Sequence, residues 1–310
     1  MLPNMIFTKK TALLIILFFA FSRTVSAQDT TGTDLIAEFE KEMKLDQKNQ
    51  TNYTTATFKT TRLINGNTVE NVGKGVLDVK ISHRFGKLNG GGYELFGLDN
   101  AVMRFGFDYG ITDNFMIGIG RSSFQKTYDA FLKIKILKQS TGKKNMPVTL
   151  CYVPTIAVKS VKFEDPTRKN LFSSRLYYTH QLIIARKFSE NTSIQIMPSY
   201  IHHNLVKYAG ESNNQFAMGI GGRQKITKRL SLNAEYYYQL PGTKLTGRTN
   251  SFSLGIDIET GGHVFQLHFT NSRGLNESNF ITETTGQWDK GDIYFGFNIS
   301  RVFTVRKRKI

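Results

Sequence analysis

Apolar and polar side chains alternate with a period of two over residues 101–121. Odd positions from 101 to 111 and from 115 to 119 hold aromatic or aliphatic residues, whereas the even positions between them include Arg104, Asp108 and several glycines. Successive side chains of a strand point to opposite faces, so this period predicts strands with one apolar and one polar face. The polar residues 112–114 predict a turn between two such strands. This hairpin pattern restricts the chain more than any other feature of the sequence does.

The same alternation recurs to the C-terminus and predicts about twelve strands. Each is near the ~9–11 residues that a tilted strand needs to cross a bilayer. The expected strands cover residues 75–85, 101–111, 115–121, 128–136, 148–159, 172–188, 194–202, 216–225, 230–239, 252–259, 265–269 and 293–303.

The predicted links between strands also follow a pattern. Links after the second, sixth, eighth and tenth strands are very short, whereas those after the first, fifth, seventh, ninth and eleventh are longer. The links after the third and fourth strands fit this rule only in part. Short turns at one end and long loops at the other are typical of outer-membrane barrels. We expect extracellular loops at residues 163–171, 204–214 and 272–290.

A soluble sandwich or a lipocalin-like barrel would show the same alternation with its apolar face inward. Three features favour a membrane barrel. The apolar face carries almost no charge, glycines accumulate on the opposite face, and proline is scarce, with no second apolar layer evident. Past residue 27 no apolar run is long enough for a helical span. We therefore predict an all-β, transmembrane, antiparallel up-and-down barrel.

Residues 1–27 have the features of a signal peptide. Two lysines precede the apolar run 12–21, and small residues precede an expected cleavage after Ala27. Residues 28–56 are expected to form a polar periplasmic leader. Within it, residues 34–44 have apolar side chains at helical spacing, which predicts a short amphipathic helix or, alternatively, a disordered segment.

The barrel itself is assigned to residues 57–305, with residues 306–310 as a basic C-terminal tail on the periplasmic side. Ahead of the first strand, residues 58–64 are extended in character and Asn65-Gly66 is a strong turn signal.

The expected mature chain is basic. Without the three basic residues of 1–27 it has 38 Lys and Arg against 24 Asp and Glu, a net charge of +14. The basic residues are spread over alternating strands and no recognition helix is evident, which argues against nucleic acid. Anionic lipid, lipopolysaccharide or anionic solutes fit an exported chain better. The single cysteine, Cys151, allows no internal disulfide.

Four stretches resemble the membrane-bound β-barrel family DUF5777 of Bacteroidota. They are FKTTRLINGNTVENVGKGVLDVKISHRFG (58–86), YELFGLDNAVMRFGFDYGITDNFMIGIGRS (93–122), YDAFLKIKILKQSTG (128–142) and FGFNISRVF (295–303). The resemblance implies an outer-membrane barrel and supplies no functional residues. One departure from general barrel practice is the basic run that follows Phe303, because insertion signals usually end on an aromatic residue.

The polar face is expected to line the lumen. Its charged members are Asp78, Lys80, Arg84, Arg104, Asp108, Lys133, Lys135, Lys159, Arg175, Arg223, Lys225, Glu235, Asp257 and Glu259. Unpaired charges in a narrow interior are costly, so they must pair or be hydrated. The nine basic residues outnumber the five acidic ones, which favours a water-filled, anion-biased passage or a bound anion. The alternative is a lumen closed by ion pairs.

Catalytic and metal sites are not expected. A lipid-cleaving site on the outer face needs a serine beside a histidine and an asparagine. His180 and His202 point outward without such a serine, although Asn204 follows His202. His202 and His203 are interpreted as an interfacial pair at a strand end. His263 and His268 fall on opposite faces of one expected strand, so they cannot easily bind the same metal ion. The glycines at 90–92 lack the other residues of a phosphate-binding loop.

The sequence thus predicts a non-enzymatic outer-membrane barrel without a cofactor, acting as a narrow channel or transporter for small, anion-biased solutes. The alternative is a structural or interaction barrel with a closed lumen that acts through its extracellular loops. The expected partners are outer-membrane lipid and lipopolysaccharide, the barrel-assembly machinery and a small solute, but not nucleic acid.

Overall fold

The computed structural model describes residues 37–43, 49–163, 165–167, 169–261 and 263–306. The chain divides after Asn49 into two units, and in the first of them residues 37–43 are helical. The expected signal peptide, residues 28–36 and 44–48 of the leader and residues 307–310 of the tail lie outside the described residues. No helix within the described ranges is long and apolar enough to cross a membrane.

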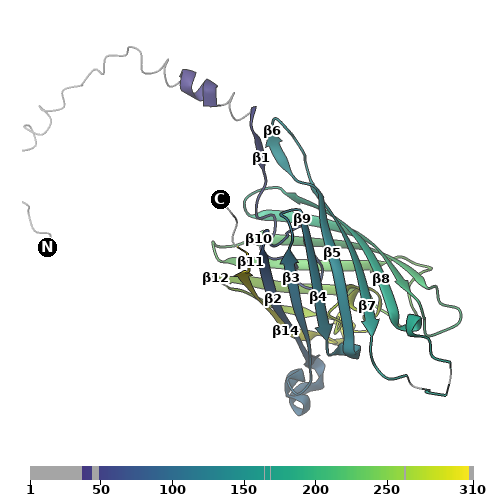
Figure 1. Ribbon diagram of the computed structural model, residues 1–310. Helices are drawn as coiled ribbons and strands as arrows, with labels where there is room; N and C mark the ends of the chain where they lie inside the picture. The colour runs from purple at the N-terminus through teal and green to yellow at the C-terminus, as the bar shows by residue number, and fades with distance from the viewer. Residues whose placement is uncertain (1–36, 44–48, 164, 168, 262, 307–310) are drawn as a thin grey trace, which may run out of the picture. The chain divides into compact units, whose positions relative to one another are not determined.

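Twelve antiparallel strands close into a barrel, as the sequence predicted (Figure 1). Each strand pairs with its neighbour in the chain, and the last strand pairs with the first to close the ring. The wall strands are β2 (Val76–Lys87), β3 (Ala101–Gly110), β4 (Phe115–Ser122), β5 (Thr127–Leu137), β7 (Thr149–Lys159), β8 (Leu176–Lys187), β9 (Thr192–His203), β10 (Asn214–Lys225), β11 (Leu230–Gln239), β12 (Ser251–Thr260), β13 (His263–Thr270) and β14 (Tyr294–Thr304).

The remaining elements are short. Strands β1 (Thr51–Tyr53) and β6 (Ser140–Gly142) pair with each other outside the ring. The others are the helix α3 and four 3₁₀ turns: η1 (Leu88–Gly97), η2 (Phe124–Lys126), η3 (Phe172–Arg175), α3 (Glu277–Thr282) and η4 (Trp288–Lys290).

The apolar face of the wall points outward. On β3, Phe105 and Phe107 are 45% and 44% exposed, whereas Arg104 and Asp108 are 1% exposed. The same division recurs around the ring, with exposed aliphatic and aromatic side chains on every second position. A soluble barrel would instead bury that face, because contiguous apolar surface of this extent is not stable in water. The inside-out arrangement is that of a membrane barrel.

The links sort by length to the two ends of the barrel. The short-turn end has the links 111–114, 188–191 and 226–229 and also the start of β2 and the end of β14. The long-loop end has the links 88–100, 160–175, 204–213, 240–250 and 271–293. Two links are exceptions, as expected: 123–126 is short at the long-loop end, and 138–148, which contains β6, is long at the short-turn end.

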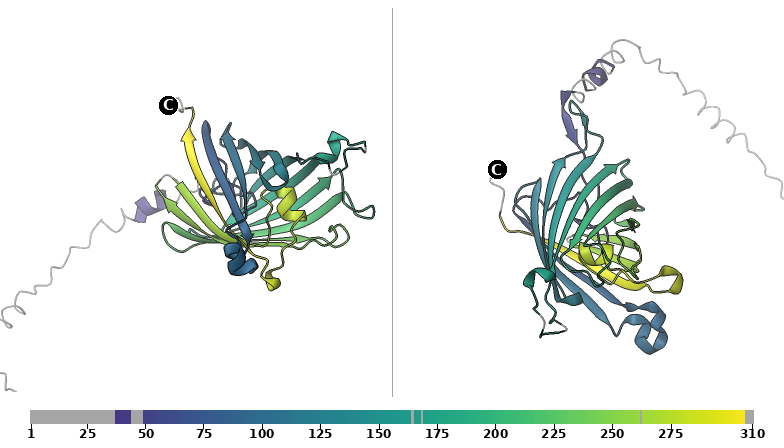
Figure 2. Two further views of the ribbon diagram at one scale, coloured as in Figure 1. Left: turned by 90° about the horizontal axis from the view of Figure 1, so that it is seen from below. Right: turned by 90° about the vertical axis from the view of Figure 1, so that its right-hand side faces the viewer.

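Two segments of the chain fold into the space inside the ring (Figure 2). Residues 57–72, here called the lumen hairpin, turn at Asn65-Gly66 and are buried or half-buried throughout. Residues 270–284, here called the lumen loop, enter from the long-loop end and bury all of α3. The expectation that 272–290 is an extracellular loop is therefore wrong for most of that segment, and residues 57–72 are not part of the wall.

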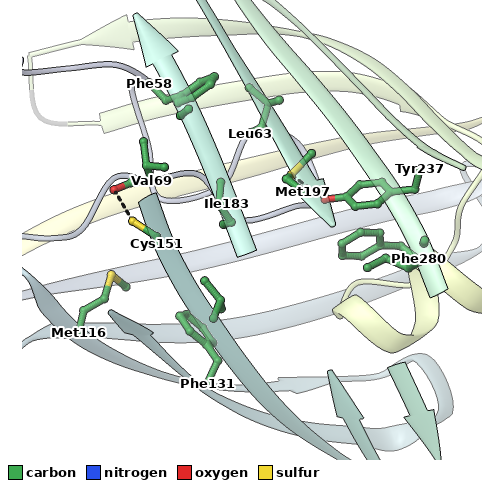
Figure 3. Close-up of a cluster of buried hydrophobic side chains, with 14 of the residues drawn as sticks. Phe58, Leu63, Val69, Met116, Phe131, Cys151, Ile183, Met197, Tyr237 and Phe280 are labelled. Carbon is green, nitrogen blue, oxygen red and sulfur yellow. Dashed lines mark hydrogen bonds between the residues drawn. The ribbon is translucent and has the colours of Figure 1, made fainter. Parts of the chain in front are cut away.

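These segments complete an apolar core that the sequence did not indicate (Figure 3). Its members from the wall face inward, and the rest come from the hairpin and the loop: Phe58, Leu63, Val69, Val72, Met116, Phe131, Cys151, Val153, Ile183, Ala185, Met197, Ile201, Ala217, Tyr237, Phe280 and Ile281. The hairpin approaches the wall closely at Gly221, where an added Cβ would lie 2.5 Å from Leu63 Cδ2. A second apolar layer therefore exists, inside the barrel.

The outward position of the apolar face predicts how the wall tolerates charge. Met218→Arg, on the outward face in the middle of β10, should destabilise the barrel in lipid vesicles by about 2–4 kcal/mol. Gln224→Arg, on the same face near the end of that strand, should cost at most about 1 kcal/mol. Equilibrium urea unfolding of the vesicle-inserted protein measures both. Equal effects of the two substitutions would show that β10 does not face lipid.

Candidate functional site

The tip of the lumen hairpin rests on one carboxylate of the wall. Glu235 of β11 accepts hydrogen bonds from the backbone N–H groups of Ile64 (3.3 Å), Asn65 (2.8 Å) and Gly66 (3.1 Å). The side-chain amide of Asn65 also donates to Ser253 Oγ at 2.9 Å. Successive N–H groups of a turn form a concave anion site. The turn and the carboxylate therefore satisfy each other's polar groups in a buried setting.

Two buried cations of the wall are held by oxygen atoms of the hairpin. Arg84 donates to Asn65 Oδ1 at 2.7 Å. Lys133 donates to the carbonyl oxygens of Thr61 at 2.9 Å and Glu70 at 3.1 Å. Within the part of the chain that the structure describes, neither cation has a carboxylate at ion-pair distance. The hairpin oxygens thus supply the negative partial charge that a bound anion would otherwise supply to these cations.

Other wall charges pair among themselves. Lys80 lies between Asp78, at 2.9 Å, and Asp108. Arg104 holds Asp129 through two nitrogen atoms, one of them Nε at 2.9 Å from Oδ1. Asp129 is absent from the residues predicted to line the lumen, although its place in the alternation puts it on the inward face. The expected excess of basic residues in the lumen is correspondingly smaller.

The two lumen segments meet at Glu277. Its Oε1 accepts from Arg62 at 2.9 Å and from the side-chain amide of Asn67 at 2.8 Å, and both donors belong to the hairpin. Glu277 is the first residue of α3, which Asn276 caps by accepting from the backbone N–H of Asn279 at 3.0 Å. Because the sequence predicted this segment as an exposed loop, it gave no signal for this contact.

The lumen loop is also fixed to the wall. Lys159 of β7 donates to Glu283 at 2.6 Å, and His203 of β9 is hydrogen-bonded to Thr282 Oγ1 at 2.9 Å. Burial raises the pKa of the Glu283 carboxyl, but the charge of Lys159 and its hydrogen bond outweigh burial, so the pKa lies below its usual value. His203 therefore faces the lumen and not the membrane interface.

The remaining predicted lumen residues lie in different settings. Asp257 is buried and accepts from Gln266 Nε2 at 2.9 Å, whereas Glu259 pairs with Lys59 of the hairpin. Arg175 is not a wall residue, because it lies in η3 and donates to the carbonyl of Lys159 at 2.9 Å. Three basic residues are half-buried near the short-turn end: Lys135, Arg223 and Lys225.

The outward histidines make contacts with polar and aromatic groups. His180 Nδ1 lies 2.6 Å from Tyr152 Oη, and His202 Nδ1 lies 2.7 Å from Asn214 Oδ1, so Asn214 and not Asn204 orients His202. No serine is hydrogen-bonded to either imidazole within the described ranges. No group of three potential metal ligands occurs among the described residues either.

The contacts of Glu235 predict how firmly the hairpin tip is held. Glu235→Gln keeps the side-chain size but removes the charge that the three N–H groups face. Because hydrogen bonds to charged groups contribute about 1.5–3 kcal/mol, amide exchange at residues 64–66 should accelerate at least tenfold. Hydrogen–deuterium exchange with mass spectrometry measures this. Ser231→Ala, on the same face of β11 without a hairpin contact, is the control, and unchanged exchange in Glu235→Gln would contradict the assignment.

Comparison with protein-family models agrees with the barrel. Residues 58–303 match the family model described as membrane bound beta barrel domain (DUF5777). The NanC porin is similar at 9% identity and a TM-score of 0.46, over 73% of this chain and 98% of its own. The KdgM porin has 8% identity and a TM-score of 0.44, over 74% and 99%. An outer membrane channel from Pseudomonas putida F1 has 14% identity and a TM-score of 0.43, over 76% and 98%.

The sequence matches no curated protein. The family match extends over most of the chain, and the predicted family is confirmed. A Bacteroidota source stays a prediction.

Proposed function

This chain belongs to the DUF5777 family of membrane-bound β-barrels, and we propose that it is an outer-membrane barrel with a gated lumen for small solutes. In this proposal the short-turn end and both chain ends of the barrel face the periplasm, and the long loops face outward. The expected signal peptide, with cleavage after Ala27, would direct export. The protein carries out no catalytic step, and its partners are outer-membrane lipid, lipopolysaccharide and the barrel-assembly machinery.

The observation that carries this proposal is the chemistry between the hairpin and the wall. Charged wall groups face polar groups of the hairpin and not apolar side chains: Glu235 and Lys133 contact its backbone, and Arg84 contacts the side-chain oxygen of Asn65. A permanently filled lumen gains nothing from such charges, because apolar packing in place of buried charges is often as stable or more stable. Charges are useful in a lumen that becomes wet when the hairpin leaves.

Space for such a movement exists beside the hairpin. A cavity of about 530 Å³ lies between the hairpin and the strands β12, β13, β14 and β2. Its lining includes Phe58, Glu70, Glu259, His263 and Val302, which places it toward the short-turn end. The chain enters the hairpin from the same end, through β1. Withdrawal of the hairpin toward the periplasm therefore crosses no other part of the wall.

The junction at Glu277 links this movement to the outside. The lumen loop is continuous with the segment 285–293 at the long-loop end, and its Glu277 holds Arg62 and Asn67 of the hairpin. A solute that moves the loop would remove two polar contacts of the hairpin at once. We assign the loop the role of the outer gate and the hairpin that of the inner gate.

A closed interaction barrel is the second candidate. The buried packing inside the lumen favours it, because the hairpin and the loop bury an apolar cluster that includes Leu63, Tyr237 and Phe280. In that case the exposed residues 169–173 and 207–210 of the two links at the long-loop end would contact the partner. The two candidates differ in whether the lumen ever conducts.

Conductance in planar bilayers separates the candidates. The mature chain should show rare, discrete openings, and Glu235→Gln should make them at least about tenfold more frequent, since the charge-assisted contacts of the closed state are weakened. A cysteine pair at Asn65 and Ser253, whose side chains are hydrogen-bonded, should abolish conductance until a reductant is added. Heat-modifiable mobility in electrophoresis checks that each variant is folded. Silence of all folded variants, before and after reduction, would favour the closed interaction barrel.

The open lumen should prefer anions. Arg84 and Lys133 lose their hairpin oxygens when the hairpin leaves, whereas Lys80 and Arg104 keep wall carboxylates. Lys133→Gln should therefore reduce the anion preference of the open state, measured as the reversal potential in a salt gradient. Lys135→Gln and Arg223→Gln near the short-turn end should have smaller effects, and an unchanged potential in Lys133→Gln would contradict the proposed selectivity.

A further inference from the structure

The outward face of the strands carries only basic charges. Its charged members among the described residues are Lys87, Arg121, Arg186 and Arg301, whereas the strand carboxylates all face inward. Lys87 pairs with Asp292 at 2.7 Å. Arg121, at the long-loop end of β4, has no carboxylate partner in the described part of the chain. A free guanidinium on the outer wall is directed toward the membrane interface.

Arg121 is fixed in place by Tyr128 of the neighbouring strand. Its Nε donates to Tyr128 Oη at 3.1 Å, and its guanidinium carbon lies 5.4 Å from the centre of that ring. This leaves the two terminal nitrogens of the guanidinium free to donate. Two parallel N–H groups held in one orientation match the geometry of a phosphate.

An apolar groove of about 390 Å³ lies on the outer wall next to Arg121. This size falls within the roughly 300–1,000 Å³ of small-ligand pockets. The groove forms because Ala130 is small, whereas its neighbours on the same face are large: Phe105, Phe107, Ile119, Tyr128 and Ile156. Its lining is almost entirely hydrocarbon, which suits an acyl chain and not a polar solute.

The link next to this groove is the shortest one at the long-loop end. It covers residues 123–126, so no long loop arises directly above Arg121. It adds a second exposed cation, Lys126. A bulky headgroup can therefore lie over the rim while its acyl chain descends along β4 and β5.

We infer that Arg121 and this groove bind one lipid A-type lipid, with a phosphate on the guanidinium and an acyl chain in the groove. The inference rests on the proposed function in one respect, the placement of the long-loop end in the outer leaflet, where phosphorylated, multiply acylated lipid is found. The cationic outer face and the apolar groove are complementary to the two halves of such a lipid.

Native mass spectrometry of the folded mature chain in detergent, titrated with bisphosphorylated lipid A, tests this assignment. One tightly bound lipid is expected. Arg121→Gln should weaken binding at least about tenfold, because charge-assisted hydrogen bonds to phosphate are lost. Ala130→Phe, which fills the groove from the outward face without touching the lumen, should weaken it similarly. Arg301→Gln, at the opposite end of the barrel, is the matched control and should leave affinity unchanged.

Three results would overturn the inference. They are equal affinity of Arg121→Gln and the unaltered chain, equal loss in Arg301→Gln, and equal binding of dephosphorylated lipid A or phosphatidylglycerol in place of lipid A. Heat-modifiability and bilayer conductance are measured on the same preparations. Lost lipid binding with retained gating refutes only the lipid site, whereas retained lipid binding in a barrel that never conducts refutes only the gated lumen.

Discussion

A closed ring of twelve strands encloses more space than its own inward side chains can fill, since about eight strands are already enough to leave room for a small ligand. The enclosed space must therefore hold water or further polypeptide. Here it holds two segments from opposite ends of the chain, the lumen hairpin 57–72 and the lumen loop 270–284. Many inward wall residues contact one of these two segments, among them Glu235, Lys133 and Lys159.

The lumen hairpin meets mainly apolar side chains on one side of the barrel and mainly polar ones on the other, with Lys133 of β5 and Gln195 of β9 as polar exceptions on the apolar side. Strands β4 to β10 supply apolar inward side chains such as Met116, Ile183 and Met197, which pack on the hydrophobic side of the hairpin. The opposite strands supply carboxylates, amides and cations that bind its backbone, among them Glu235 and Gln266, the latter donating to the carbonyl of Leu63 at 2.8 Å. The hairpin thus has an apolar side and a polar side, as a surface strand has. Unlike a surface strand, it has both sides covered by the barrel wall.

The wall could be predicted from the sequence because alternation is local. The strand number, the outward apolar face and both exceptions in link length follow from residues close together in the chain. The contents of the lumen could not be predicted in this way. The turn at Asn65-Gly66 was visible, but its carboxylate partner Glu235 is 170 residues away. Likewise the polarity of 272–290 is that of an exposed loop, and only tertiary contacts such as Arg62–Glu277 bury it.

The seam between β14 and β2 has a consequence for biogenesis. These strands are the last and first of the wall, and the hairpin immediately precedes β2. Once the seam has closed, the hairpin can reach the lumen only through the short-turn end. Several of its wall partners, such as Glu235 and Gln266, lie on β11 to β14, which are synthesised last, so an incompletely made chain lacks both a closed ring and these contacts. Such high contact order slows folding. The barrel therefore needs its C-terminal strands for two steps: to close the ring in the membrane and to hold the hairpin inside it.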